Sequence, residues 1–402
     1  MRSTIALQRS RAGFVVPAAS TARHVAFALL TIGLWLFATE AQSQQRNQRL
    51  LLAQQEALRA KLNEDTVLVA TSHPTGSYFA MAYAIATVLE KNGAVRVLPL
   101  PGDGGMDALR DLLFLRGMDL AIVPANVLAH AKNSEALGAG LTQRISYVAR
   151  LHNEEVHVLA GRHTKALADL SGKKVGVPLR DGRAQFAAAD LFGRFRINVE
   201  VVTMPSAEAL ELVRSGELAA VLLTGAKPLP QLADMPQDGS MKLLALPFTA
   251  AMEEAYVPAA FRAADYPSLI PEGQVVEGVA VSTVLVAHSA KGIGDTTPSM
   301  TKFVPAFFDA MSEQPLPGYN KLDVNLAATL PGWSRLPVAE DWLRKAQQRQ
   351  ALTLQKNFDE FLRLTHPAGS PSPTPAQRKK LFDDFVIWTR KSMGETEALA
   401  RR

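Results

Sequence analysis

The sequence predicts an α/β protein built from two lobes that are joined by a hinge. From residue 66 onward, short segments rich in Val, Leu and Ala alternate with helical segments, which is typical of parallel strands covered by helices on both faces. Two longer extended runs, Ile145–Ala160 and Val275–Ala287, bracket one block of this alternation. They indicate that one lobe is inserted into the other, so that the chain crosses between the lobes twice.

The individual elements follow from apolar runs that end in turn residues and from helical periodicity between them. In chain order, the predicted strands are Val67–Thr71, Val95–Leu100, Leu120–Val123, Val156–Ala160, Lys174–Val177, Val199–Met204, Leu218–Leu223 and Leu243–Leu246. The predicted helices are Tyr78–Asn92, Met106–Arg116, Ala184–Phe195, Ala207–Ser215, Ala250–Ala263, Ser299–Met311 and one near Val338–Leu343. Within them, Phe303, Phe307 and Phe308 lie at helical spacing and are predicted to be core residues.

The domain organisation follows from these elements. Lobe I is expected to comprise residues 65–151 and 278–343, and lobe II residues 152–277. Two further regions flank the lobes: a helical lead-in at residues 44–64 and a helical C-terminal extension at residues 344–402.

The first crossing between the lobes contains the only polar interruption of its extended run, His152-Asn153-Glu154-Glu155. We interpret Glu154-Glu155 as a solvated turn and His152 as a hydrogen-bonding residue of the hinge. His152 and His157 lie five residues apart in an extended stretch and therefore point to opposite faces, which makes them a poor metal-binding pair.

The N-terminal region, residues 1–43, reads as a signal peptide or an anchor. Four arginines precede an uninterrupted apolar run, Val25–Ala38, and small residues suited to signal-peptidase cleavage follow it. The run is shorter than the roughly 20 residues that a membrane-spanning helix needs. A cleaved signal peptide is favoured, and an inner-membrane anchor formed by residues 25–38 is the alternative. Both interpretations place the protein in the periplasm.

The C-terminal extension contains a Pro/Ser-rich linker at residues 366–375, between a polar helix, Leu343–Thr365, and an amphipathic segment, Gln377–Lys391. The amphipathic segment has a cationic lead-in. It either contacts a membrane surface or a partner, or it folds back on its own domain.

Composition and motifs exclude several classes of protein. The chain has no cysteine, which rules out disulfides and thiolate chemistry. Its net charge of +5 comes from the two terminal regions, so it gives no support for nucleic-acid binding. There is no G-x-G-x-x-G after the first strand, no P-loop, no G-x-S-x-G and no H-E-x-x-H. We therefore expect no enzyme activity, no cofactor and no metal site.

Four loops stand at the carboxyl ends of predicted strands, where open parallel sheets bind their ligands. They are Ser72–Tyr78, Gly102–Gly105, Pro124-Ala125-Asn126 and Thr224-Gly225. Each one alone is also explained by ordinary turn and cap chemistry. Together they place several helix N-termini at one edge, which favours an anionic or carboxylate-bearing ligand.

The same residues resemble a known family, the TAXI-type solute receptors of TRAP (tripartite ATP-independent periplasmic) transporters. The resemblance runs from about Val67 to Val286 and is carried by Gly117–Val123 (GMDLAIV), Leu167–Val177 (LADLSGKKVGV) and Ser215–Pro228 (SGELAAVLLTGAKP). Two loops depart from the family pattern. Pro124-Ala125-Asn126 replaces a Gln-Ser-Asp-like triplet, and Arg180–Ala184 replaces a Gly-Ser-Gly-Thr loop.

The resemblance implies a type II periplasmic-binding-protein-like clamshell that captures a small molecule and presents it to membrane-embedded TRAP subunits. On this basis Thr75, Gly76 and Ser77 are predicted to hold an anionic group and Tyr78 to pack against it. Directional hydrogen bonds are expected from Asn126, Arg183 and the Thr224-Gly225 loop. Arg183 is predicted to be a bidentate carboxylate partner, with an exposed turn arginine as the alternative. The alternative function is a membrane-tethered ligand-sensing or scaffold module on the same fold.

Overall fold

The computed structural model describes residues 44–386, apart from 62, 64, 92, 94, 180–181, 234, 237, 290–297, 314–324 and 366–373. The predicted signal peptide or anchor and most of the predicted linker lie outside the described residues. The described residues up to 63 and those from 65 onward belong to separate units. In the first unit, residues 44–61 are helical and expose Leu50, Leu51, Leu52 and Leu58. No helix among the described residues is long and apolar enough to cross a membrane.

The sheet of lobe I begins with three parallel strands, β1 (Thr66–Ala70), β2 (Arg96–Leu100) and β3 (Leu120–Pro124). Every residue of β3 is buried, because helices cover both faces of the sheet. The helices are α2 (Ser77–Lys91), α3 (Gly105–Phe114), α4 (Ala125–Ser134) and the short α5 (Leu141–Arg144). Here α2 packs with α9 (Pro298–Glu313) on one face, and α3 and α4 pack on the other.

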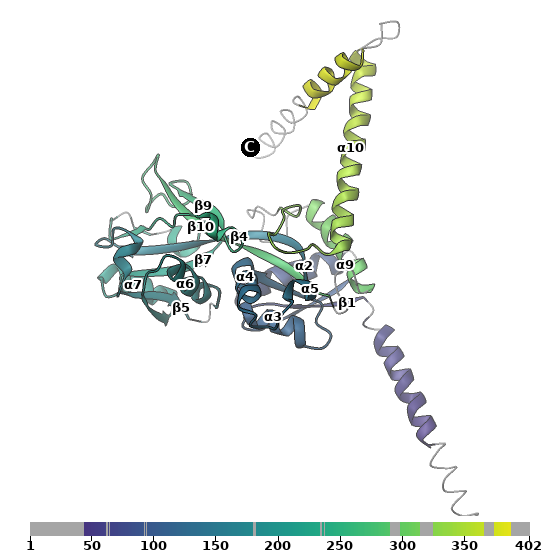
Figure 1. The fold of residues 1–402 in the computed structure, drawn as a ribbon, viewed down its shortest axis with the longest axis horizontal. Coiled ribbons are helices and arrows are strands. Elements are labelled where there is room, and N and C mark those ends of the chain that lie inside the picture. Colours follow the sequence, from purple (N-terminus) through teal and green to yellow (C-terminus); the bar gives the residue numbers. More distant parts are fainter. Residues whose placement is uncertain are drawn as a thin grey trace, which may run out of the picture. The chain divides into compact units, whose positions relative to one another are not determined.

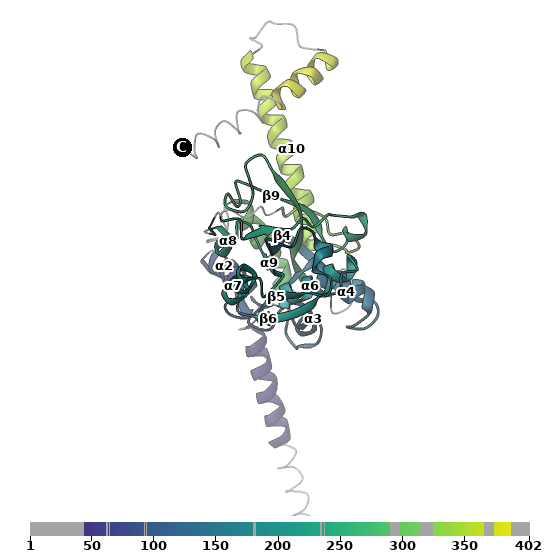
Figure 2. The same ribbon diagram turned by 90° about the vertical axis from the view of Figure 1, so that its left-hand side faces the viewer.

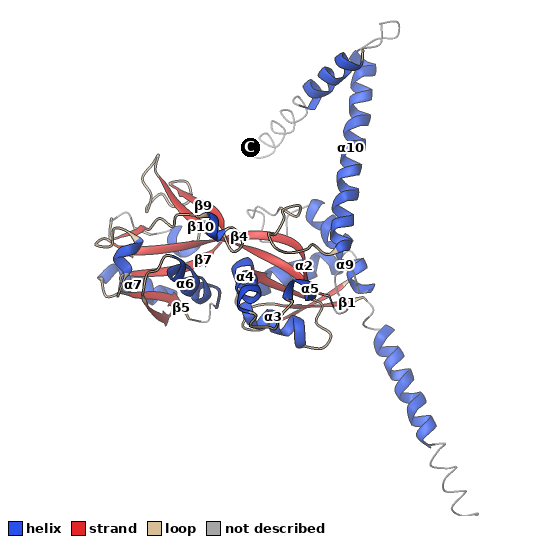
Figure 3. Cartoon of the chain, viewed as in Figure 1, coloured by secondary structure: helices blue, strands red, loops and turns tan. Residues whose placement is uncertain are grey.

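Two long antiparallel strands, β4 (Ile145–Gly161) and β10 (Val275–His288), connect the two lobes (Figures 1 and 3). Residues Thr283–Ala287 of β10 pair with β3 in lobe I. Residues Glu155–Ala160 of β4 pair with β7 in lobe II. Within the described residues, the hydrogen-bonded order is therefore continuous: β2-β1-β3-β10-β4-β7-β5-β6. The parallel strands on either side of β4 and β10 nevertheless have their own covering helices.

Lobe II repeats the parallel arrangement with β5 (Lys174–Pro178), β6 (Glu200–Met204) and β7 (Ala220–Gly225). Its helices are α6 (Gly182–Arg194), α7 (Ser206–Ser215), a 3-10 turn at Leu167–Leu170 and the short α8 (Pro230–Ala233). Two strands lie off the main path: β8 (Met241–Leu243) pairs with β4, and β9 (Val257–Arg262) pairs with β10.

One predicted helix is wrong. Residues Ala250–Met252 form only a 3-10 turn, and Val257–Arg262 is strand β9 rather than the end of a helix over Ala250–Ala263. Pro258 lies inside the segment, where it would remove a helical hydrogen bond and clash with the preceding turn. The pairing of β9 with β10 also buries Phe261, which is 1% exposed.

The C-terminal region is helical. A single helix, α10 (Pro337–Thr365), runs through the segments predicted as two helices, and its start packs against α9 where Trp342 meets Phe308 at 5.0 Å between ring centroids. Phe303, Phe307 and Phe308 are buried, as predicted. Residues 375–386 form a further helix beside α10, seen in Figures 1 and 2. Its apolar face packs on α10, with the rings of Phe385 and Phe358 5.5 Å apart.

Candidate functional site

The loop after β1 turns the chain sharply into α2. Thr71 Oγ1 donates to the carbonyl of Leu100 at 2.9 Å, which fixes the start of the loop on the neighbouring strand. A Cβ at Gly76 would lie under 3.0 Å from Ser72 Oγ and 3.0 Å from the His73 carbonyl oxygen, so glycine suits this close return of the backbone. The turn thereby directs the first residues of α2, Ser77 and Tyr78, toward the middle of the protein.

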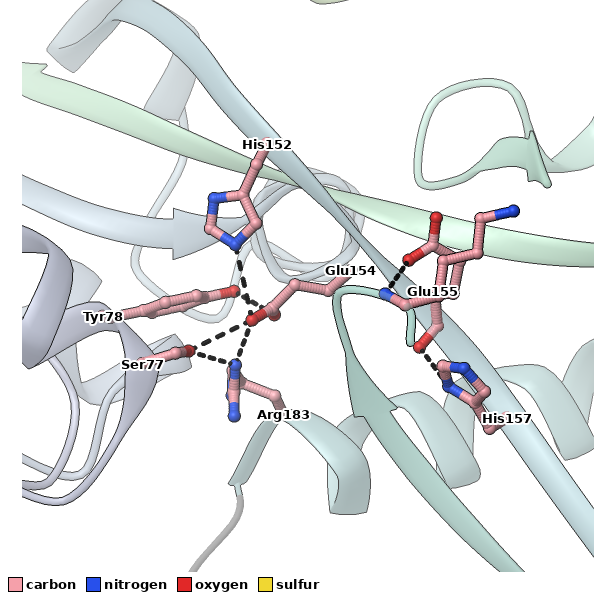
Figure 4. Close-up of polar contacts among 8 residues, drawn as sticks. Ser77, Tyr78, His152, Glu154, Glu155, His157 and Arg183 are labelled. Atoms are coloured by element: carbon pink, nitrogen blue, oxygen red, sulfur yellow. Dashed lines mark hydrogen bonds and ion pairs between the residues drawn. The ribbon is translucent and has the colours of Figure 1, made fainter. Parts of the chain in front are cut away.

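There the side chains of Ser77 and Tyr78 meet a carboxylate that comes from β4. Ser77 Oγ donates to Glu154 Oε1 at 3.1 Å, and Tyr78 OH donates to Glu154 Oε2 at 2.9 Å. Arg183, from the first turn of α6, forms an ion pair with the same carboxylate and donates to Ser77 Oγ at 2.7 Å. His152 Nε2 lies 3.7 Å from Glu154 Oε1. We call these five residues the Glu154 cluster (Figure 4).

The Glu154 cluster is buried and charge-paired. The exposed fraction of the side chain is 4% for Glu154 and 17% for Arg183. Burial raises the pKa of Glu154, but Arg183, His152 and the Tyr78 hydroxyl outweigh it and hold that pKa at about 2. Burial and the neighbouring carboxylate raise the pKa of Tyr78 well above its ordinary value. The Arg183 guanidinium also lies 4.9 Å from the centroid of the Tyr78 ring, a cation–π distance.

A cavity of about 570 Å³ lies next to the cluster, between the lobes. Its lining comes from both lobes: His73, Asp103, Gly104, Gly105, Met106, Asp107, Val127, Gly182, Gln185 and Phe186. The lining includes the first turns of α3, α4 and α6. Neither the α3 nor the α4 N-terminus is capped by a side-chain hydrogen bond, although the Asp107 N–H of α3 donates to the Gly104 carbonyl. Such helix N-termini favour an anionic group. Among the described residues, no group of three His, Cys, Asp or Glu side chains could hold a metal ion.

A second polar cluster lies on the opposite face of β4, inside lobe II. His157 Nδ1 donates to the carbonyl of Glu155 at 3.0 Å, so its Nε2 accepts from Tyr266 OH at 2.7 Å. The Tyr266 oxygen in turn accepts from the Leu229 N–H at 2.8 Å. Burial lowers the pKa of His157 to about 3, so its ring is neutral. We call this the His157 cluster.

A family model described as the NMT1-like family matches residues 69–302, more than half of the chain. The chain belongs to the NMT1-like family. This is a family of periplasmic solute-binding proteins rather than enzymes, which confirms the predicted kinship with TAXI receptors. The fold is accordingly the mixed α/β fold of periplasmic binding proteins, with an added helical C-terminal region.

Solved structures with similar folds have low sequence identity to this NMT1-like chain. A periplasmic transporter is 15% identical over 73% of this chain and 97% of its own, with a TM-score of 0.43. A TctC solute-binding protein from Polaromonas is 13% identical over 62% and 83%, with a TM-score of 0.38. An ancestral arginine-binding protein bound to arginine is 16% identical over 62% and 93%, with a TM-score of 0.37. No curated protein sequence matches the chain.

The eight residues predicted to bind the ligand in this NMT1-like protein fall into four groups. Ser77, Tyr78 and Arg183 belong to the Glu154 cluster, while Thr75 and Gly76 form the turn in front of it. Asn126, which is 2% exposed, donates to Tyr256 OH at 3.2 Å. Thr224 and Gly225 end β7 opposite Val156 and Glu155 of β4. None of the eight is among the residues that line the cavity, so their contact with a ligand stays a prediction.

Sequence reasoning missed the residue at the centre of the site. Glu154-Glu155 was interpreted as a solvated turn, and that interpretation is wrong: both residues lie in β4, and Glu154 is buried. His152 lies in β4 beside Glu154, and its role as a hydrogen-bonding residue of a hinge stays a prediction. A single clue to Glu154 existed, because an acidic residue inside an apolar extended run requires a buried partner.

Proposed function

We propose that this protein captures a small carboxylate-bearing organic solute between its lobes and presents it to the membrane-embedded subunits of a TRAP-type transporter. The observation that carries the proposal is the cavity between the lobes, at which α3 and α4 begin without a side-chain cap. Family membership supports the solute-binding part. The transporter part is supported by the TAXI-like segments, such as Gly117–Val123 and Ser215–Pro228.

The lining suits a small organic acid. A volume of about 570 Å³ is within the range of small-molecule sites. Uncapped first-turn N–H groups favour a carboxylate, with roughly 0.3–1 kcal/mol from each helix end at exposed sites. Met106, Val127 and Phe186 supply apolar surface for the carbon skeleton, and Asp103 can accept hydrogen bonds from hydroxyl groups of the solute.

The predicted binding residues retain roles in this proposal. The Thr75-Gly76 turn supports the loop that contains His73, and His73 lines the cavity. Asn126 supports the start of α4, where the next residue, Val127, lines the cavity. Arg183 follows Gly182, which lines the cavity from lobe II. Thr224-Gly225 lies at the end of β7, and neither residue lines the cavity.

The proposal is tested by filling the cavity. Met106, in the first turn of α3, lines the cavity, whereas Leu115 follows the other end of the same helix and is 47% exposed. The mature protein is first screened with organic acids by thermal shift, since a ligand that binds only the folded state raises the melting temperature. We expect Met106→Trp to weaken the best acid at least tenfold in calorimetry and Leu115→Trp to leave its affinity unchanged.

Two results would contradict the proposal. If no organic acid raises the melting temperature, the ligand class is wrong. If Met106→Trp binds the acid as tightly as the Leu115→Trp control, the solute does not occupy this cavity.

A further inference from the structure

The Glu154 carboxylate receives hydrogen bonds and an ion pair from helices of both lobes. Ser77 and Tyr78 come from α2 in lobe I, Arg183 comes from α6 in lobe II, and Glu154 itself lies on the connecting strand β4. The contact between Arg183 and Ser77, at 2.7 Å, joins the two lobes directly. The cluster is therefore complete only when α6 and α2 lie against each other.

A carboxylate in this position needs its partners. An ionised side chain that is 4% exposed is costly to bury unless a cation and hydrogen-bond donors surround it. Moving α6 away from α2 breaks the contact between Arg183 and Ser77. It also takes from the Glu154 carboxylate either its cation or its hydrogen-bond donors from α2. The charge of Glu154 therefore disfavours separation of the lobes.

We propose that Glu154 is a positioning residue that holds Arg183 of lobe II against Ser77 and Tyr78 of lobe I, so that the lobes favour the closed arrangement before any solute binds. This inference rests on the proposed function, because the solute enters between the same two lobes. It gives Arg183 a role that differs from the one predicted from the sequence. The guanidinium acts through an internal carboxylate, and the solute binds in the neighbouring cavity.

A second bridge between the lobes limits the size of the expected effect. Asn126 of α4 donates to Tyr256 OH, which itself donates to Asp190 of α6 at 2.6 Å. Lys132 of α4 also forms an ion pair with Glu254. Neutralising Glu154 leaves both of these bridges intact. The expected result is therefore a change in the populations of two arrangements, not complete opening.

The experiment measures the distance between the lobes in the absence of any solute. Because the chain has no cysteine, two introduced cysteines take spin labels without interference. Glu90 on α2 and Glu208 on α7 are both exposed and suit this purpose. In pulsed electron paramagnetic resonance we expect the full chain to show a dominant short distance. In Glu154→Gln, the ratio of short to long distances should fall at least fivefold.

Matched variants separate this role from general support of the strand. Glu155→Gln alters the adjacent residue on the other face of β4 and should leave the distances unchanged. Arg183→Met should produce the same shift as Glu154→Gln, and the double variant should add nothing further, because both changes remove one interaction. Glu154→Asp keeps the charge and should restore most of the short-distance population.

The inference is overturned if Glu154→Gln and Arg183→Met each keep the distance distribution of the parent protein, or if their effects add. Arg183→Met decides the question if Glu154→Gln does not fold. This failure differs from that of the proposed function. Unchanged distances reject the role of Glu154 whichever solute binds, whereas a screen without a binding acid rejects the ligand class and leaves the distances valid.

Discussion

Glu154 and Glu155 are neighbours in the sequence, but they belong to two clusters with opposite physical character on the two faces of β4 (Figure 4). Glu154 is ionised, and its pKa is held at about 2 by Arg183, His152 and Tyr78 in spite of burial. Burial raises the pKa of Glu155, whose Oε2 accepts the Lys227 N–H at 3.0 Å. The Glu154 cluster joins two lobes, whereas the His157 cluster is complete within lobe II.

The interactions of the Glu154 cluster can change when the lobes move, whereas those of the His157 cluster stabilise the fold of lobe II. A network of hydrogen bonds and an ion pair whose members come from both lobes is broken in part when the lobes separate, so its energy depends on their arrangement. A neutral hydrogen-bond network inside one lobe is unaffected by that motion and contributes to folding alone. Variants on the His157 side should therefore change stability without changing the distance between the lobes.

The largest expected effect on stability comes from Tyr266→Phe. Tyr266 is fully buried, and its hydroxyl satisfies both the Leu229 N–H and His157 Nε2. Removal of the hydroxyl leaves a buried donor and a buried acceptor without partners, which should lower the free energy of unfolding by about 2–4 kcal/mol. Urea unfolding at pH 7 measures this.

The matched control for that variant is Tyr83→Phe. Tyr83 is 63% exposed, and its change should stay within about 0.5 kcal/mol of the parent protein. If the two tyrosine variants were equally stable, the hydroxyl of Tyr266 would not satisfy a buried network. The spin-label distance distribution should be the same in both.

The next effect is a pH dependence that His157 imposes on stability. Its pKa is about 3 in the folded protein against an ordinary value of 6.5, so between these values the unfolded chain binds a proton that the folded chain does not. Stability therefore falls as the pH drops below 6.5, by roughly 1.4 kcal/mol per pH unit. We expect His157→Gln to lose this slope between pH 6.5 and 5.

Urea unfolding of the parent protein and of His157→Gln at several pH values measures the slope. The titration of Glu154 does not contribute to the slope of stability between pH 6.5 and 5. Its lowered pKa makes its contribution present above the ordinary value of 4.5 and lost only as the pH falls from there toward about 2. Burial and Arg144 also lower the pKa of His288, but that residue is common to both proteins and cancels in the difference. Equal slopes in the two proteins would show that His157 takes up a proton while folded.

The sequence was informative wherever burial alone decides the structure. Runs such as Leu120–Val123 contain nothing but buried side chains and could only be strands between helices. The helix predicted over Ala250–Ala263 is wrong because the segment forms β9 by pairing with β10. The paired residues lie 13 positions apart at Arg262↔Val275 and 23 apart at Val257↔Ala280, and periodicity does not reveal such a partner. Local pattern competes with such pairing and loses.

The site was predicted less well for a similar reason. Loops at strand ends were found, and Gly102–Gly105 does contribute to the cavity lining. Glu154 was missed because its partners, Tyr78 and Arg183, lie 76 and 29 residues away in the chain. Two adjacent glutamates in an extended run suggest a solvated turn as long as the cation that pairs with one of them in the fold is not known. The charge of Arg183 was predicted to serve a ligand, because an internal carboxylate was not visible in the sequence.

The smallest effect distinguishes the two neighbouring glutamates most directly. Glu155 is needed as a hydrogen-bond acceptor for the Lys227 N–H, and a glutamine oxygen can accept the same bond. The Lys227 ammonium has its own partner in Asp265, at 3.1 Å. We therefore expect Glu155→Gln to change the free energy of unfolding at pH 7 by less than about 1 kcal/mol. A loss above about 2 kcal/mol in urea unfolding would show that Glu155 acts through its charge, and the contrast between the two faces of β4 would then disappear.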